Sequence, residues 1–258
     1  MRKFTFALLA ASALASPARA EMVAALVGDD TIAIVDTDAK KAGKSLKVTG
    51  ASAKLVGIDV RPADGMLYGV SSDGTIWTID TASGKATQKS KLDMPLPGNA
   101  TITVDFNPVA DRLRVIGSDS SNLRVNVDDG KVTKDGDLKY AEADANKGKT
   151  PKIVAGAYAN SMKGAKETTL YDIDASGVVL RQAPPNDGVL NTVGQLGMNA
   201  PDIVAFDILS DAQGGNTGWL MAGNTLYRID LQSGKGTEAA KIEGVSGPVR
   251  DIAVLPKM

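Results

Sequence analysis

The sequence contains neither cysteine nor histidine. Without cysteine the chain forms no disulfides, so its fold must depend on an apolar core. Without histidine it lacks the commonest general base and the usual protein ligand of zinc, copper and haem iron. These absences exclude Ser-His-Asp triads, Cys-His dyads and c-type haem attachment. Any catalysis must use Asp, Glu, Lys, Tyr, Ser or Arg, or a metal ion bound through oxygen.

Long apolar runs are also missing after the first twenty residues. The chain begins with Arg2 and Lys3, continues with an apolar run over 4–14, and reaches a small-x-small site that ends at Ala20. This pattern is typical of a secretory signal peptide cleaved after Ala20. No later stretch approaches the roughly 20 apolar residues that a spanning helix needs. We therefore expect a periplasmic or secreted protein without a transmembrane segment, with a signal peptide over 1–20 and one domain over 21–258.

Neither sign of charge is in large excess. Without its first twenty residues the chain has 26 basic and 30 acidic side chains, a net charge of −4. A mildly acidic surface offers no electrostatic footprint for nucleic acid or anionic lipid. The expected partner is therefore a small ligand of unknown identity, or an envelope or extracellular protein.

What the sequence does contain is a repeated phrase: an apolar strand, a tight turn, a second strand and then glycine. Four copies begin at Leu67, Leu113, Thr169 and Trp219, and a looser copy begins at Ala25. Further apolar strands start at Leu55, Ile102, Ile153, Ile203 and Val249, at separations of 47, 51, 50 and 46 residues. Such a period, with four strands in each unit, is typical of a β-propeller. We predict an all-β propeller of five four-stranded blades, with a β-sandwich as the alternative.

The two ends of the chain support a closed ring. The segment 249–255 resembles the first strand of a unit with nothing after it, and 22–48 resembles a unit without its first strand. Joined, they complete one blade from both termini and leave no open sheet edge. The polar stretch over 140–149 is expected to form a long loop.

When the first strands are aligned, three of the five units carry an aspartate at one position, and a fourth aspartate lies two residues earlier on the same strand face. These candidate metal ligands are Asp59, Asp105, Asp207 and, as the displaced one, Asp251. Tyr158 and Ala253 fill the aligned position in the other two units. First strands line the channel of a propeller, where converging carboxylates repel one another unless a cation is present. Oxygen ligands favour Ca²⁺ or Mg²⁺ as the cofactor.

A structural role is the alternative for these aspartates. Each would accept hydrogen bonds from backbone amides, or pair with Arg61, Arg112 or Arg250, and so hold its blade in place. Buried charges are generally paired in this way. The sequence leaves both interpretations open.

Two further features supply candidate ligand-binding residues. One is a basic stripe in LRVIGSDSSNLRVN, and the other is a stiff, turn-rich loop that begins Ala183-Pro184-Pro185. The candidates are Arg112, Arg114 and Arg124 in the stripe, and Asn186, Asp187 and Asn191 in the loop. The stripe suits an anionic ligand, or equally ion pairs with neighbouring aspartates. The loop suits a binding role on a rigid scaffold, or equally a turn.

Several longer phrases stand out along the chain: GIDVRPADGMLYGV, VDFNPVADRLRV followed by NLRVN, TTLYDID, and PPNDGVLNTVGQLG. In these phrases, and over nearly the whole chain after residue 20, the sequence resembles a family of secreted bacterial proteins that share a domain of unknown function. Members of the family resemble small β-propellers. The resemblance therefore implies export and a propeller, and it implies no activity, cofactor or catalytic residue.

The predicted function is a non-enzymatic module that binds a small ligand or a protein, with a divalent-cation site in its channel. The alternative is a hydrolase of the lactonase, esterase or glycosidase type that uses the channel aspartates. A structural envelope protein is a third class. Against a glycosidase, none of the five glutamates after residue 20 lies in a first strand to act as an acid. We assign no catalytic residue.

Overall fold

The computed structural model describes residues 21–98, 100–198, 204–211 and 213–256. The predicted signal peptide lies outside the described residues. Within them the chain forms 21 strands and one short 3₁₀ turn, η1 (Pro185–Asp187). In this part of the chain, no helix is long and apolar enough to cross a membrane.

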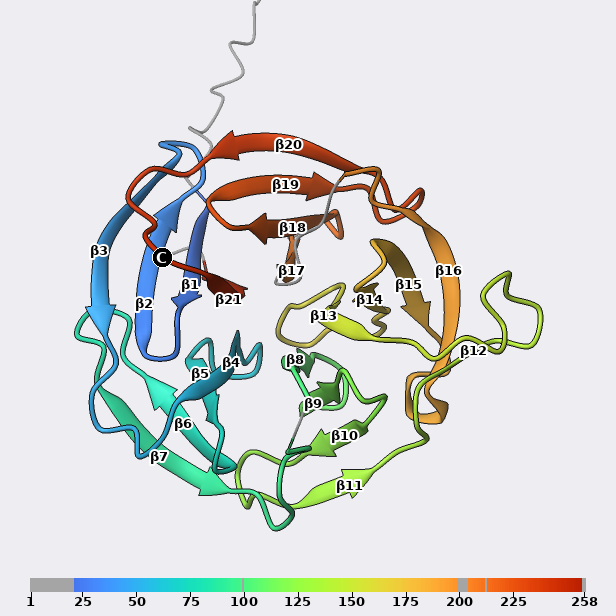
Figure 1. Cartoon of the computed structure of the whole chain (residues 1–258). Coiled ribbons are helices and arrows are strands. Elements are labelled where there is room, and N and C mark those ends of the chain that lie inside the picture. The colour runs from blue at the N-terminus through green and yellow to red at the C-terminus, as the bar shows by residue number, and fades with distance from the viewer. Residues whose placement is uncertain (1–20, 99, 199–203, 212, 257–258) are drawn as a thin grey trace, which may run out of the picture.

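The strands form five sheets arranged as the blades of a propeller around a central channel (Figure 1). Blade 1 is β21 (Val249–Val254), β1 (Met22–Val27), β2 (Thr31–Asp36) and β3 (Lys41–Lys47). Blade 2 is β4 (Leu55–Val60), β5 (Leu67–Ser71), β6 (Thr75–Ile79) and β7 (Ala86–Lys91). Blade 3 is β8 (Ile102–Asn107), β9 (Arg112–Gly117), β10 (Asn122–Val125) and β11 (Val132–Lys134).

The last two blades follow the same order from the channel outwards. Blade 4 is β13 (Ile153–Tyr158), β14 (Leu170–Asp174), β15 (Val178–Gln182) and β16 (Val189–Gln195), with β12 (Lys139–Tyr140) added at its outer edge. Blade 5 is β17 (Ala205–Ser210), β18 (Asn216–Ala222), β19 (Thr225–Ile229) and β20 (Gly236–Lys241). The prediction of a five-bladed propeller is confirmed.

Blade 1 is built from both ends of the described chain, as predicted. β21 pairs antiparallel with β1, and Val23 lies opposite Val254. The amide of Leu255 donates to the carbonyl of Met22 at 2.8 Å, which extends the pairing past the strand ends. Since β21 covers the inner edge of β1, the ring closes without a covalent cross-link.

The stretch over 140–149 forms a loop from Ala141 onwards, as expected, but Tyr140 belongs to a short strand. β12 pairs in parallel with β16, with Lys139 opposite Val189 and Tyr140 opposite Leu190. The amide of Gly136 also donates to the carbonyl of Asn186 at 2.9 Å. The chain leaving blade 3 therefore crosses onto blade 4 before it enters that blade.

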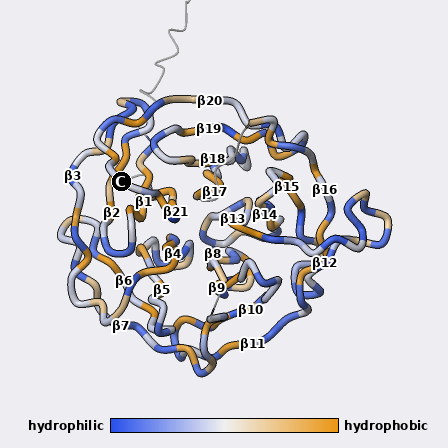
Figure 2. Tube along the Cα trace, viewed as in Figure 1, coloured by the Kyte–Doolittle hydropathy of each residue, from blue (hydrophilic) through white to orange (hydrophobic). Residues whose placement is uncertain are grey.

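The core lies between neighbouring blades. Among the described residues, the buried apolar side chains form five clusters, and each cluster joins two adjacent blades. All five residues of β5 are buried, whereas β7, at the outer edge of the same blade, is mostly exposed after Ala86. The inner strands carry much of the apolar sequence (Figure 2). Stacking thus buries faces that a single blade would expose.

Deleting residues 249–258 tests how much the ring depends on its shared blade. The deletion removes β21, exposes the edge of β1 and uncovers apolar surface of blades 1, 2 and 5. We expect the loss of several kcal/mol of unfolding free energy to lower the thermal midpoint by about 10 °C or more. For a chain of this size, each kcal/mol of unfolding free energy that is lost lowers the midpoint by about 2–4 °C. Circular dichroism measures the midpoint. Deletion of residues 257–258 alone is the control, and an equal midpoint for both variants would contradict closure.

Candidate functional site

The innermost strands bring three of the predicted aspartates together in the channel. One carboxylate oxygen from each of Asp59, Asp105 and Asp207 lies within 4.8 Å of the other two. These side chains come from β4, β8 and β17, and they are almost completely buried. Asp251 of β21 is also buried, but it contributes no oxygen to this group. The sequence register thus found the three members of the cluster, which we call the channel aspartates.

Backbone amides hold two of the channel aspartates from two directions. Asp59 accepts the amide of Val60, next to it in β4, and the amide of Phe106 in β8, each at 2.6 Å. Asp207 accepts the amide of Ile208 and the amide of Val254 in β21, also at 2.6 Å. In each case one oxygen stays within its own strand and the other crosses to the next blade.

The other two aspartates make equivalent links. Asp105 accepts the amide of Tyr158 in β13 at 2.9 Å. Asp251 accepts the amides of Ile58 in β4 at 2.9 Å and of Ile252 at 3.0 Å. Four of the five neighbouring pairs of inner strands are therefore tied by a carboxylate. Hydrogen bonding to backbone amides, one part of the structural alternative, is present in the fold.

The remaining junction, between β13 and β17, has no such link among the described residues, and β13 has alanine where β4, β8 and β17 have aspartate. The amide of Tyr158 binds Asp105 as the amide of Phe106 binds Asp59, so Tyr158 corresponds to Phe106. The residue of β13 that matches the aspartates is therefore Ala157. The predicted equivalence of Tyr158 was wrong by one residue, whereas that of Ala253 is confirmed by the bond from Val254 to Asp207.

The arginines named in the structural alternative bind elsewhere. Arg61 pairs with Asp111 at 2.6 Å and with Asp128 at 3.0 Å, and Arg250 pairs with Asp29 at 2.8 Å. No lysine or arginine of the described residues forms an ion pair with a channel aspartate. Their charge is therefore balanced only by amide dipoles.

The pKa values of these carboxyls reflect that imbalance. Burial, followed by the negative charge of Asp207, raises the pKa of Asp59 well above its usual range. Burial and the charges of Asp59 and Asp207 do the same for the pKa of Asp105. Burial raises the pKa of Asp207 to about 6, although two amide hydrogen bonds oppose it. Burial also raises the pKa of Asp251 well above the usual range. A cation among these groups would favour their charged forms.

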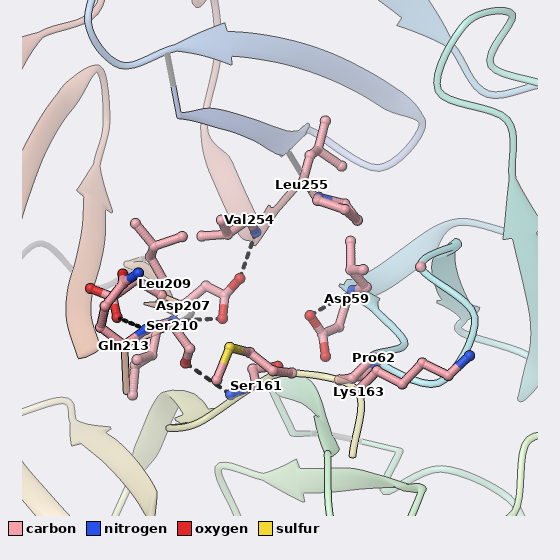
Figure 3. A pocket seen from close by; sticks show the side chains of 16 residues that line it. Asp59, Pro62, Ser161, Lys163, Asp207, Leu209, Ser210, Gln213, Val254 and Leu255 are labelled. Carbon is pink, nitrogen blue, oxygen red and sulfur yellow. Dashed lines mark hydrogen bonds between the residues drawn. The ribbon is translucent and has the colours of Figure 1, made fainter. Parts of the chain in front are cut away.

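A cavity of about 510 Å³ opens at the end of the channel where the inner strands finish. Asp59 and Asp207 lie at its base, and the segment after β13 contributes Ser161, Met162 and Lys163 (Figure 3). We call it the channel-mouth cavity. Sequence reasoning missed these three loop residues because nothing in their types or spacing links them to the aspartates.

The basic stripe divides in the structure. Arg114 is buried and contacts Asp135, Asn122 at 2.8 Å, Asn186 at 2.9 Å and the hydroxyl of Tyr158 at 3.1 Å. These contacts join β9 to the Pro184-Pro185 loop of blade 4.

The other stripe and loop candidates also bind within the protein. Arg124 binds both oxygens of Asp135, at 2.6 and 2.9 Å. Arg112 donates to the carbonyl of Asp111 at 2.8 Å, and Asn191 donates to the carbonyl of Ala183 at 3.2 Å. Asp187 is exposed in η1. None of the six candidates in the stripe and loop lines the channel-mouth cavity.

One buried carboxyl was not found from the sequence. Asp172 of β14 is fully buried toward blade 3, and neither of its oxygens has a hydrogen-bond partner among the described residues. Its Oδ1 lies 2.6 Å from where a Cβ on Gly156 would be, so glycine is needed opposite it. Burial raises the pKa of Asp172 to about 8, against the lowering effect of Arg114. The only sequence feature that could have indicated a buried Asp172 is its position among apolar residues in LYDID.

We expect the metal-free protein to lose stability as the pH rises from about 5 to above 8. A carboxyl with a raised pKa keeps its proton in the folded state after the unfolded state has lost it, so its stabilisation is present at low pH. That stabilisation disappears as the pH passes the folded pKa values of about 6 for Asp207 and about 8 for Asp172. Urea unfolding in EDTA at several pH values measures the effect. Asp207→Asn should make the free energy of unfolding depend less on pH near pH 6. A wild-type free energy of unfolding that rises with pH over this range would contradict the raised pKa values.

Several solved structures match this chain at low identity. A protein of unknown function from Bacteroides thetaiotaomicron VPI-5482 has a TM-score of 0.54 at 16% identity, over 92% of this chain and 65% of that chain. One from Bacteroides caccae has a TM-score of 0.48 at 12% identity, over 93% and 100% of the two chains. Catalytically inactive virginiamycin B lyase from Staphylococcus aureus, with quinupristin, has a TM-score of 0.46 at 15% identity, over 84% and 73%. The first likeness shows the fold alone.

Sequence comparison gives the family. A search of curated proteins finds no match. One family model, described as Domain of unknown function (DUF4394), matches residues 31–253 and so includes every channel aspartate. This match agrees with the family resemblance carried by phrases such as VDFNPVADRLRV and PPNDGVLNTVGQLG. The chain belongs to that family.

Proposed function

We propose that the protein is an exported, non-enzymatic binding module whose channel holds one divalent cation, Ca²⁺ or Mg²⁺. The observation that carries the proposal is the convergence of three carboxylate oxygens within 4.8 Å of one another. Oxygens at this separation or closer can bind one ion together, because a Ca²⁺–oxygen bond is about 2.4 Å long. Mg²⁺ has shorter bonds, at about 2.1 Å, and needs the oxygens to be closer together.

The hydrogen bonds of the carboxylates are compatible with a bound cation. An ionised carboxylate has about four lone-pair sites. Asp59 and Asp207 each accept two hydrogen bonds from backbone amides, which leaves further lone-pair sites on each carboxylate. Asp105 accepts one such hydrogen bond among the described residues. The amides also fix the orientation of each carboxylate, so little order is lost when the ion binds.

The electrostatic cost of the cluster supports the same proposal. The three carboxylates are buried with no ion-paired lysine or arginine, and burial raises the pKa of each. The negative charges of neighbouring aspartates raise the pKa of Asp59 and Asp105 further. Ca²⁺ takes six to eight oxygen ligands, so three carboxylates leave positions for water or for oxygens of a ligand. The channel-mouth cavity, with Asp59 and Asp207 at its base, is where such a ligand would enter.

Thermal unfolding with and without the cation tests the proposal. An ion that binds only the folded state raises the midpoint by mass action. We expect millimolar Ca²⁺, at 100–1,000 times a Kd in the micromolar range, to stabilise EDTA-treated protein by about 3–4 kcal/mol. The triple variant of Asp59, Asp105 and Asp207 to Asn should lose this shift. Its midpoint without Ca²⁺ should also fall, because asparagine has one acceptor oxygen where Asp59 and Asp207 each use two.

Asp251→Asn is the matched control. It removes a buried carboxyl with the same hydrogen-bond pattern, but one that does not belong to the three-oxygen cluster. Its response to Ca²⁺ should match the wild type. The absence of any shift in the wild type, or an equal shift in the triple variant, would refute the cation site. Turnover of esters, lactones or glycosides that vanished in the triple variant would refute the non-enzymatic part and favour a hydrolase.

A further inference from the structure

A second cavity lies beside the channel mouth, between blades 1 and 2. Its volume is about 860 Å³, within the range of small-molecule sites. Met22 and Ile34 of blade 1 face Met66, Leu67 and Ile79 of blade 2 across it. We call it the blade 1–2 groove. Its lining is mostly apolar, and the exposed fraction of Met66, at 43%, is unusually large for such a side chain.

The groove adjoins the channel-mouth cavity. The two share Gly65, Leu255 and Pro256 as lining residues. From these shared residues the groove extends outwards to the turn between β6 and β7, where Asp80, Thr81 and Lys85 line it. The two cavities therefore lie side by side, one ending at the channel aspartates and the other at the outer part of blade 2.

The charges along the two cavities differ at their outer and inner ends. The outer end has one acidic and one basic group, Asp80 and Lys85, and Asp80 is already bound to the amides of Ala82 and Ser83. The inner end has the open positions of the proposed cation. It also has Lys163, which forms no ion pair among the described residues. An anionic oxygen group therefore fits the inner end, and hydrocarbon fits the groove between.

We propose that the two cavities together bind an amphiphilic monocarboxylate. Its carboxylate completes the coordination of the channel cation, and its hydrocarbon chain lies in the blade 1–2 groove. This inference rests on the proposed function, because the head group needs the cation. It adds the class of ligand, an acid whose affinity comes from a buried chain rather than from polar contacts.

Decanoate is the probe, titrated into the full mature protein with Ca²⁺ and followed by calorimetry. We expect one binding site per chain and at least a tenfold loss of affinity when EDTA removes the cation. Octanoate should bind about tenfold more weakly than decanoate, because each buried methylene contributes about 0.8 kcal/mol. Acetate has no hydrocarbon chain to bury, so it should bind the Ca²⁺-loaded protein without the gain in affinity that the methylene groups give.

Met66→Asp tests the path of the chain. The substitution puts a charge on the groove wall at an exposed position, so the protein should remain folded while decanoate affinity falls by about tenfold or more. Val109→Asp is the matched control, since Val109 is 48% exposed in the corresponding β8–β9 turn and does not line the groove. Its affinity for decanoate should equal that of the wild type.

The outcomes separate this inference from the proposal beneath it. If Ca²⁺ raises the thermal midpoint but decanoate does not bind, the ligand class is wrong and the cation site stands. Decanoate binding that persists in EDTA, or that falls equally in Met66→Asp and Val109→Asp, also overturns the inference. If Ca²⁺ causes no midpoint shift at all, the cation site fails and the inference fails with it.

Discussion

Hydrogen bonds from the amides of one inner strand to an aspartate of the previous one hold this propeller together at its centre. They tie β21 to β4, β4 to β8, β8 to β13 and β17 to β21. In a chain without cysteine, they supply the directional links between blades that apolar stacking alone does not provide. They also fix where the carboxylates point, so the geometry of the channel follows from the packing of the ring.

These links carry an electrostatic cost. Amide donors lower the pKa of each carboxyl, but burial raises it by more, so the net shift is upward at all four aspartates. The charges of neighbouring aspartates add to the shift at Asp59, Asp105 and Asp251. Asparagine has one acceptor oxygen, whereas Asp59 and Asp207 each accept backbone amides through both of their oxygens. A carboxyl group is therefore what allows one side chain to bind its own strand and the next blade together.

The fold was largely predictable from the sequence because its period, its turns and its split blade are local patterns. The channel aspartates were predictable for the same reason, since one register places Asp59, Asp105 and Asp207 alike. The register failed in β13, where Tyr158 was aligned in place of Ala157. β4 and β13 have the same shift in pairing after their first residue, so Ala157 follows Ile153 as Asp59 follows Leu55. The bond from Arg114 to Asn186, the strand β12 and the loop over the channel mouth depend on contacts between distant segments, for which the sequence carries no local signal.

The shared blade has a consequence for how the molecule assembles. β1 precedes every other described strand in the chain, yet its partner β21 is the last of them, with Val23 opposite Val254. Long-range pairings of this kind form late, because a large loop must close before they gain any contact energy. Blade 1 therefore stays incomplete while the other four can form, and an inner edge of β1 is open during that interval. The pairing of β21 therefore closes the ring and adds the links of Asp207 and Asp251, whereas the links of Asp59 and Asp105 do not involve β21.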